Sequence, residues 1–164
     1  MAIYDRVAPA GFPGFVTREL LSVIEAGFLA NTTNVQYGWP VKFSASTGKF
    51  TGIASGDAAT VFAGILARSA VQAGTSATPQ NAVSPLPDIA QAQSILRNGY
   101  INVTCFVGTP VRGAPVYMRV TTVSANVFGQ LEATADGANS VVLPGVTWAV
   151  NGKDVNNVSE IYID

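Results

Sequence analysis

Apolar and polar residues alternate one by one along much of the chain, the pattern of β-strands that bury one face. The alternation is plainest in residues 116–120, where Val, Met and Val are separated by Tyr and Arg. Similar alternation or short apolar runs predict further strands at 41–45, 49–54, 61–67, 100–107, 126–134, 146–150 and 161–163.

Residues that favour tight turns separate these segments, because they tolerate a positive φ or bond to their own backbone. They stand at Ser46-Thr47-Gly48, Ser55-Gly56-Asp57, Asp136-Gly137 and Asn151-Gly152. Many short strands with such turns predict an all-β fold: a single β-barrel or sandwich domain, jelly-roll-like, over residues 17–164. A chain of 164 residues is long enough to bury a core of its own.

Two segments fit a helix or a strand. Residues 18–29 place leucines and isoleucine at helical spacing, but their β-branched and aromatic residues favour a strand, which we expect. Residues 88–96 could form a short helix capped by Asp88, or could lead into the strand that follows Gly99.

Two further segments lie outside the regular pattern. Residues 1–16 contain Pro9-Ala10-Gly11-Phe12-Pro13-Gly14-Phe15, which cannot be helical, and we interpret them as an extended N-terminal arm. Residues 72–87 form one long Pro-rich loop. Phe12 and Phe15 have no obvious local core, so they either anchor the arm on another surface or pack back on their own domain.

The composition argues against most enzyme classes. The chain has no histidine, one cysteine and only 12% charged residues. Histidine carries most proton transfer near neutral pH, and histidine and cysteine bind most transition metals. The low charge indicates that part of the surface is covered by other copies or by a larger assembly, or that it is polar without being charged.

Charge patterns point to no nucleic acid or membrane partner. The chain has nine Lys and Arg residues and ten Asp and Glu residues, and it contains no basic run and no basic amphipathic segment. The first residues lack the pattern of a secretion signal, and no apolar stretch has the length of a bilayer span. The single cysteine, Cys105, lies within an apolar strand and is expected to be a buried hydrophobe.

A search for catalytic or ligand motifs finds none. No phosphate-binding glycine loop occurs, a Ser–Lys pair has no support, and the acidic residues are scattered over turns. We therefore expect no metal and no cofactor. Trp39 and Trp148 could stack on a sugar, although their positions favour core or rim packing.

The order of short glycine-centred motifs resembles the structural cement, or head decoration, proteins of tailed bacteriophages. The similarity covers most of the chain, and the segments that carry it are Pro13-Gly14-Phe15-Val16-Thr17-Arg18, Val23-Ile24-Glu25-Ala26-Gly27, Tyr37-Gly38-Trp39-Pro40-Val41-Lys42, Phe62-Ala63-Gly64-Ile65-Leu66-Ala67-Arg68, Ile95-Leu96-Arg97-Asn98-Gly99-Tyr100-Ile101-Asn102-Val103, Gly113-Ala114-Pro115-Val116-Tyr117-Met118 and Val158-Ser159-Glu160-Ile161-Tyr162-Ile163.

This resemblance implies a non-enzymatic protein, made in the bacterial host cytoplasm, that binds the major capsid protein on the outer surface of the virion and stabilises the head. It also implies self-association as a dimer or trimer, and it assigns no site residue. From the arm itself we expect Phe12, Pro13 and Phe15 to make capsid or inter-subunit contacts, with the 72–87 loop second. The alternative is a β-sandwich module of a phage fibre that binds carbohydrate or a host.

Overall fold

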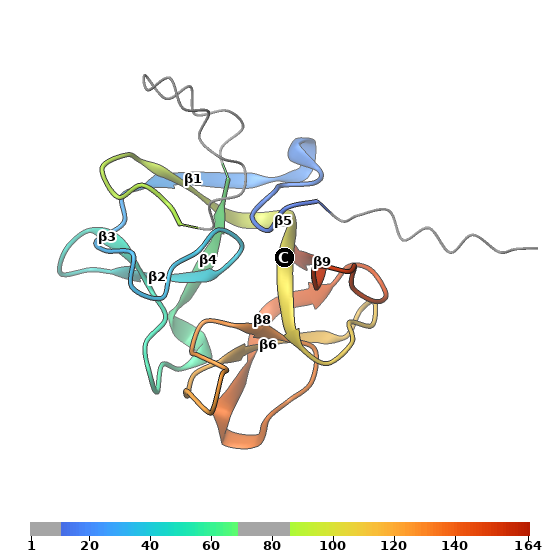
Figure 1. Cartoon of the computed structure of the whole chain (residues 1–164). Helices are drawn as coiled ribbons and strands as arrows, with labels where there is room; N and C mark the ends of the chain where they lie inside the picture. The colour runs from blue at the N-terminus through green and yellow to red at the C-terminus, as the bar shows by residue number, and fades with distance from the viewer. Residues whose placement is uncertain (1–10, 69–85) are drawn as a thin grey trace, which may run out of the picture.

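The computed structural model describes residues 11–68 and 86–164 and confirms the all-β fold class (Figure 1). Helical structure in these residues is limited to three single turns of 3₁₀ helix. The elements in chain order are η1 (Glu19–Leu21), β1 (Val23–Gly27), β2 (Pro40–Ser44), β3 (Lys49–Gly52), η2 (Ala59–Val61), β4 (Phe62–Ala67), β5 (Gln93–Val107), β6 (Pro115–Arg119), β7 (Leu131–Glu132), η3 (Gly137–Asn139), β8 (Ser140–Trp148) and β9 (Val158–Ile163).

Five strands close into a barrel in the order β5-β7-β6-β8-β9, with β9 pairing back onto β5. The closing pair is antiparallel and runs from Gly99 opposite Ile163 to Thr104 opposite Val158. Closure of this kind leaves no unpaired sheet edge around the ring. In Figure 1, β6 and β8 lie below the long β5.

The remaining strands form a second sheet on the other end of β5, in the order β3-β2-β4-β5-β1. This sheet also curls, because a parallel bridge between Leu29 and Phe50 joins the chain just after β1 to β3. Figure 1 shows β1 to β4 grouped at the upper left, with β5 passing from this group into the barrel.

Side chains that alternate along β4 and β5 contribute to two separate hydrophobic cores. On β4, Ile65 and Ala67 face the main core inside the barrel, whereas Leu66 between them faces a smaller core within the second sheet. On β5, Leu96 faces the main core and Ile95 the smaller one. Because successive side chains point to opposite faces, one short apolar run can serve two cores.

Each of the two segments with competing interpretations contains strand and no α-helix. Residues 18–29 contain the single turn η1 followed by β1. Residues 88–96 form turns and then enter β5 at Gln93, so the lead-in interpretation is confirmed and the helix is wrong. Gly99 lies within β5 instead of starting it, and a Cβ there would lie 2.6 Å from Ser22 Oγ.

Two strand predictions were too broad. The alternation at 41–45 predicts Val41 and Phe43 on one buried face, but only Val41 is buried, and Phe43 is exposed on the β2–β3 hairpin that extends beyond the core. The predicted strand at 126–134 contracts to β7, two residues long. Gly129 approaches the ring of Trp39 closely there, and this local packing replaces a regular strand.

Candidate interaction surface

The last residues of the predicted arm are fastened to the edge of β5. Gly14 N donates to Asn102 O at 2.7 Å, Asn102 N donates to Phe15 O at 2.9 Å, and Thr17 N donates to Tyr100 O at 3.1 Å. Val16 is buried in the main core and forms an antiparallel bridge with Ile101. Residues 14–17 therefore behave as a short extra strand, which we call the arm root.

Gly14 is the tightest point of the arm root. Its φ is +85°, and a Cβ on it would lie 2.8 Å from Tyr37 Cβ and 3.1 Å from Gly38 N. Only glycine combines this backbone conformation with so close an approach of another chain segment. The close contact with Tyr37 and Gly38 thus explains why the motif Pro13-Gly14 has a glycine at its second position.

Arg68, at the end of β4, holds the same point from the other side. Its backbone N donates to Gly14 O at 2.7 Å, and its Nε donates to Pro13 O at 3.0 Å. The guanidinium lies 4.5 Å from the centre of the Tyr37 ring. Burial lowers the pKa of Arg68, which disfavours its charged form, and raises the pKa of Tyr37, which keeps the phenol neutral at physiological pH.

Glu160 on β9 fastens the other end of the arm root. Thr17 Oγ1 donates to Glu160 Oε1, and Arg18 Nη2 donates to Glu160 Oε2 at 3.1 Å. The Arg18 guanidinium also lies 3.8 Å from the centre of the Tyr100 ring. These side-chain bonds add to the backbone ladder, so the chain is held from Pro13 to Arg18.

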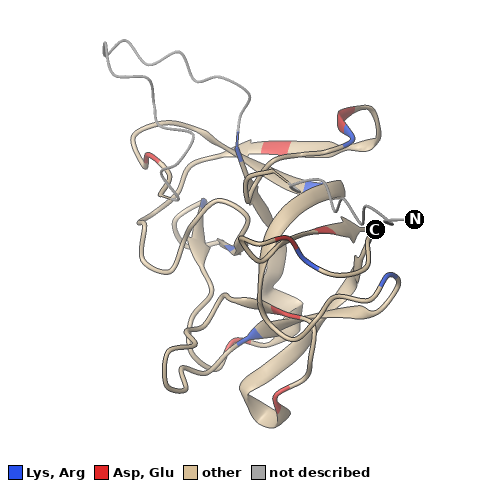
Figure 2. Ribbon diagram, turned by 45° about the vertical axis from the view of Figure 1, so that its right-hand side comes forward, with Lys and Arg blue, Asp and Glu red and all other residues tan. Residues whose placement is uncertain are grey.

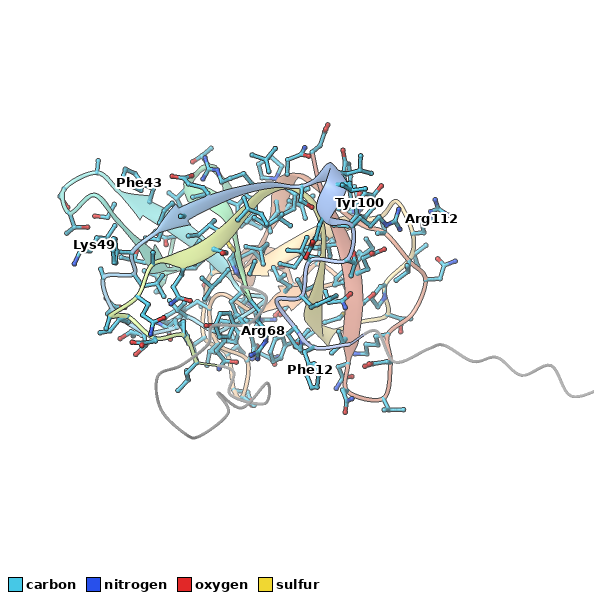
Figure 3. All side chains as sticks on the ribbon, turned by 90° about the horizontal axis from the view of Figure 1, so that it is seen from above. Phe12, Phe43, Lys49, Arg68, Tyr100 and Arg112 are labelled. Carbon is cyan, nitrogen blue, oxygen red and sulfur yellow. The ribbon has the colours of Figure 1, made fainter. Side chains whose placement is uncertain are left out.

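The predicted contact residues lie together on this fastened segment. Phe15 N donates to Phe12 O at 3.2 Å, which closes a turn around Pro13 and Gly14. The side chains of Phe12 and Phe15 are 52% and 51% exposed, and Pro13 is half-buried. Figure 3 places Phe12 near Arg68 on the lower side of the view. Two aromatic rings are thus presented to solvent from an ordered turn.

The apolar surface extends beyond the residues that the sequence singled out. Leu20 and Leu21 in η1 and Val23 and Ile24 in β1 are exposed, and residues 15–21 line a shallow, largely apolar pocket. The signal was present in the sequence, because 18–29 contains more apolar residues than one buried strand face needs. The 72–87 loop, the second predicted contact, lies almost wholly outside the described residues.

The features that would indicate a reactive or ligand-binding centre are clustered metal ligands and exposed reactive or aromatic groups. Residues 11–68 and 86–164 contain no group of three or more His, Cys, Asp or Glu side chains that could hold a metal ion. Cys105 is buried, as predicted, and burial raises the pKa of its thiol, which disfavours the reactive thiolate. Trp39 and Trp148 are buried too, so neither offers a ring face to a sugar.

Charged side chains are sparse over the whole ribbon in Figure 2. The described part of the chain contains no helix with the length and apolar character needed to cross a membrane. The exposed features most unlike an ordinary surface are therefore the aromatic turn of the arm and the apolar residues beside it.

Comparison with known proteins identifies the class. The sequence model of a family described as "Structural cement protein (E217 gp24/Pam3 gp6)" matches residues 2–164, nearly the whole chain. The chain belongs to this structural cement protein family. The resemblance carried by the short glycine-centred motifs is thereby confirmed, and this cement protein has a structural role in a phage capsid.

A solved structure supports the fold of the cement protein. A chain of the structure titled "The capsid of Myoviridae Phage XM1" matches with a TM-score of 0.70 and 18% sequence identity, covering 99% of this chain and 95% of that chain. No curated protein sequence matches the cement protein.

Proposed function

We propose that this cement protein binds the outer surface of the major capsid protein lattice and stabilises the head without catalysis. Membership of the structural cement family supports the capsid role. The observation that carries the finer proposal is the fastened aromatic turn, in which Phe12 and Phe15 are half-exposed. The backbone around them is bonded to β5 and Arg68, and the next two side chains, Thr17 and Arg18, are bonded to Glu160.

An anchor of this kind favours binding for two physical reasons. The turn is ordered before it meets a partner, so docking costs little conformational entropy. Aromatic rings supply a large apolar contact area and are enriched among the residues that dominate interfaces. A cement protein attached at several points of a lattice gains further from multivalency, which raises overall affinity far above that of one contact.

Self-association belongs to the same proposal. A dimer or trimer would present several copies of the aromatic turn at once, with Phe12, Pro13 and Phe15 contacting the capsid or a neighbouring subunit. The low charge of the chain supports coverage of part of its surface in an assembly.

The proposal is tested by co-sedimentation of the full chain with undecorated capsids of its own phage. We expect saturable binding at a stoichiometry tied to the lattice. Phe12→Ser combined with Phe15→Ser should raise the capsid concentration needed for half-saturation by at least tenfold, since two exposed aromatic anchors are lost.

Phe43→Ser is the matched control for the aromatic variant. Phe43 is also about half-exposed, but it lies on the β2–β3 hairpin away from the arm root (Figure 3). We expect it to bind capsids like the unmodified chain. Full occupancy by the Phe12/Phe15 variant would overturn the role of the arm, and no binding by the unmodified chain would overturn attachment to the lattice.

A further inference from the structure

One side of strand β1 has no strand partner in the described part of the chain, although the chain directly after β1 is bonded to Phe50 of β3. In the residues that the structure describes, the five residues of β1 pair with β5 alone, on one side. Side chains on both faces of β1 are exposed, among them Val23, Ile24 and Glu25. An apolar edge strand offers a row of backbone groups for pairing with another chain, and natural proteins normally cover or block such edges.

Apolar residues of η1 extend this edge. Leu20 is fully exposed and Leu21 is mostly exposed, which is unusual for leucines that follow one another. Together with Val23 and Ile24 they form what we call the β1 edge surface. Glu25 and Arg97 lie beside it, with 3.5 Å between Glu25 Oε2 and Arg97 Nε, and both side chains are about half-exposed.

The N-terminal residues of the chain have the complementary pattern. Residues 3–7 read Ile3-Tyr4-Asp5-Arg6-Val7 and lie outside the described residues. Added as a strand, they would place Ile3, Asp5 and Val7 on one face and Tyr4 and Arg6 on the other. With Ile3 and Val7 on the face of Ile24, Arg6 falls on the face of Glu25, whose carboxylate has the opposite charge.

The direction of the arm root favours a neighbouring copy as the source of this strand. The arm root pairs with Asn102 to Tyr100, and β1 pairs with β5 from Asn98 onward, on the same edge and in the same direction. The chain before the arm root therefore leaves from the end of that edge remote from β1. Reaching its own β1 would require a full reversal, which a second copy avoids.

We propose that residues 3–7 of one copy add as a strand to the free edge of β1 in a neighbouring copy. This rests on the self-association within the proposed function, and it names the two surfaces that meet. Main-chain hydrogen bonds give such strand addition its affinity, while alternate side chains give it specificity. If each copy passes its residues 3–7 to the next copy, the copies form a closed ring in which every contact is the same.

The experiment measures mass in solution by light scattering. The two test variants are a chain without residues 1–10 and the full chain with Ile24→Lys, whose charge blocks the edge. Val142→Lys on β8 is the matched control, because Val142 and Ile24 are both strand residues with 48% exposure. Circular dichroism confirms that each variant is folded.

We expect the full chain and Val142→Lys to be oligomers and each test variant alone to have the mass of one chain. An equimolar mixture of the two test variants should form a pair, since one supplies the arm and the other the edge. A shortened chain that remains oligomeric would instead indicate edge-to-edge pairing. A mixture that does not pair, or a full chain that stays monomeric, would overturn the proposal.

Charge reversal gives a second test that does not depend on the lysine variant. Glu25→Arg should prevent association, and Arg6→Glu added to it should restore association. No restoration would contradict the Arg6–Glu25 contact. Capsid co-sedimentation separates the two proposals: a monomeric shortened chain that binds capsids would retain the cement role, while a full chain that forms oligomers but does not bind capsids would retain the arm exchange.

Discussion

At the scale of single residues, Arg119 shows where alternation misleads. Its neighbours Met118 and Val120 are buried as the pattern predicts, and the pattern places Arg119 on the solvent face. Arg119 is nevertheless 1% exposed, because the turn that carries Asp136 covers it. Its Nε donates to buried Glu132 Oε1 at 2.5 Å, and its Nη2 donates to Asp136 Oδ2 at 2.7 Å. The alternation of apolar and polar residues along one strand does not reveal that a distant turn will cover Arg119.

The buried pair predicts a strong effect when one partner is removed. Burial raises the pKa of Glu132, and the hydrogen bond from Arg119 opposes that shift. Arg119→Met leaves a buried carboxylate without its cation, so we expect a loss of about 3–5 kcal/mol in the free energy of unfolding at pH 8. Adding Glu132→Leu should recover most of it, because no buried charge remains. Urea unfolding measures both values.

The same variant has a defined pH dependence. Without Arg119, the pKa of Glu132 rises further in the folded state, while the unfolded chain keeps an ordinary value. Between those two pKa values the folded state binds the extra proton, so stability increases as the pH falls. The loss caused by Arg119→Met should therefore be smaller at pH 5 than at pH 8. An equal loss at both pH values would show that this carboxyl does not titrate in that range.

At the scale of elements, the arm root shows how a backbone conformation is enforced by its surroundings. The proline and glycine residues of the arm predict an extended segment over residues 1–16, but not the strand to which it pairs. The bonds from Gly14 to Thr17 depend on Asn102 and Tyr100, which are more than eighty residues away along the chain. A strand with no alternation of its own can be recognised only when its partner is placed.

Two glycines separate the effect of backbone strain from the effect of close contact. Gly14 and Gly113 have nearly the same φ, +85° and +81°, but no atom lies within 4 Å of a Cβ built on Gly113. Gly113→Ala should cost about 1 kcal/mol, and Gly14→Ala should cost about 1–3 kcal/mol more, because Tyr37 must move. Chemical unfolding of both variants provides the comparison. Equal losses would mean that the contact with Tyr37 relaxes freely.

Strand positions could be predicted where the alternating apolar side chains are buried, and the prediction failed where those side chains are exposed. Residues 116–119 and 161–163 lie in strands whose apolar side chains enter the main core. On the β2–β3 hairpin the same alternation continues past the smaller core, so Val41 is buried in it but Phe43 is exposed. Alternation records which side chains could share a face, but the surrounding strands decide whether that face is covered.

At the scale of the whole molecule, the two cores share β4 and β5. The sequence predicted a single barrel or sandwich domain, and the all-β barrel is confirmed. It could not predict the second core, because the run Ile65-Leu66-Ala67 reads as one buried strand whether it serves one core or two. The bonds that Arg68, directly after β4, and Glu160 on β9 make with the arm likewise depend on long-range placement.

Shared strands predict that both cores unfold together. In a Trp39→Phe background, the remaining tryptophan, Trp148, reports the main core. Leu66→Ala in the smaller core should cost about 2–5 kcal/mol and shift the Trp148 fluorescence transition to lower urea, together with the circular dichroism transition. Leu143→Ala in the main core is the comparison. A Trp148 transition that ignores Leu66→Ala would show that the halves unfold separately.

The arm root also determines how the domain would carry a mechanical load. A pull on Gly11 along the arm acts parallel to the strand pair formed with β5, so the bonds to Asn102 and Tyr100 are sheared together instead of being unzipped in turn. Arg68 and Glu160 share that load, and β5 passes it to both cores. We therefore expect the molecule to resist tension along its arm as one unit, which is the mechanical property that the proposed attachment to a capsid lattice needs.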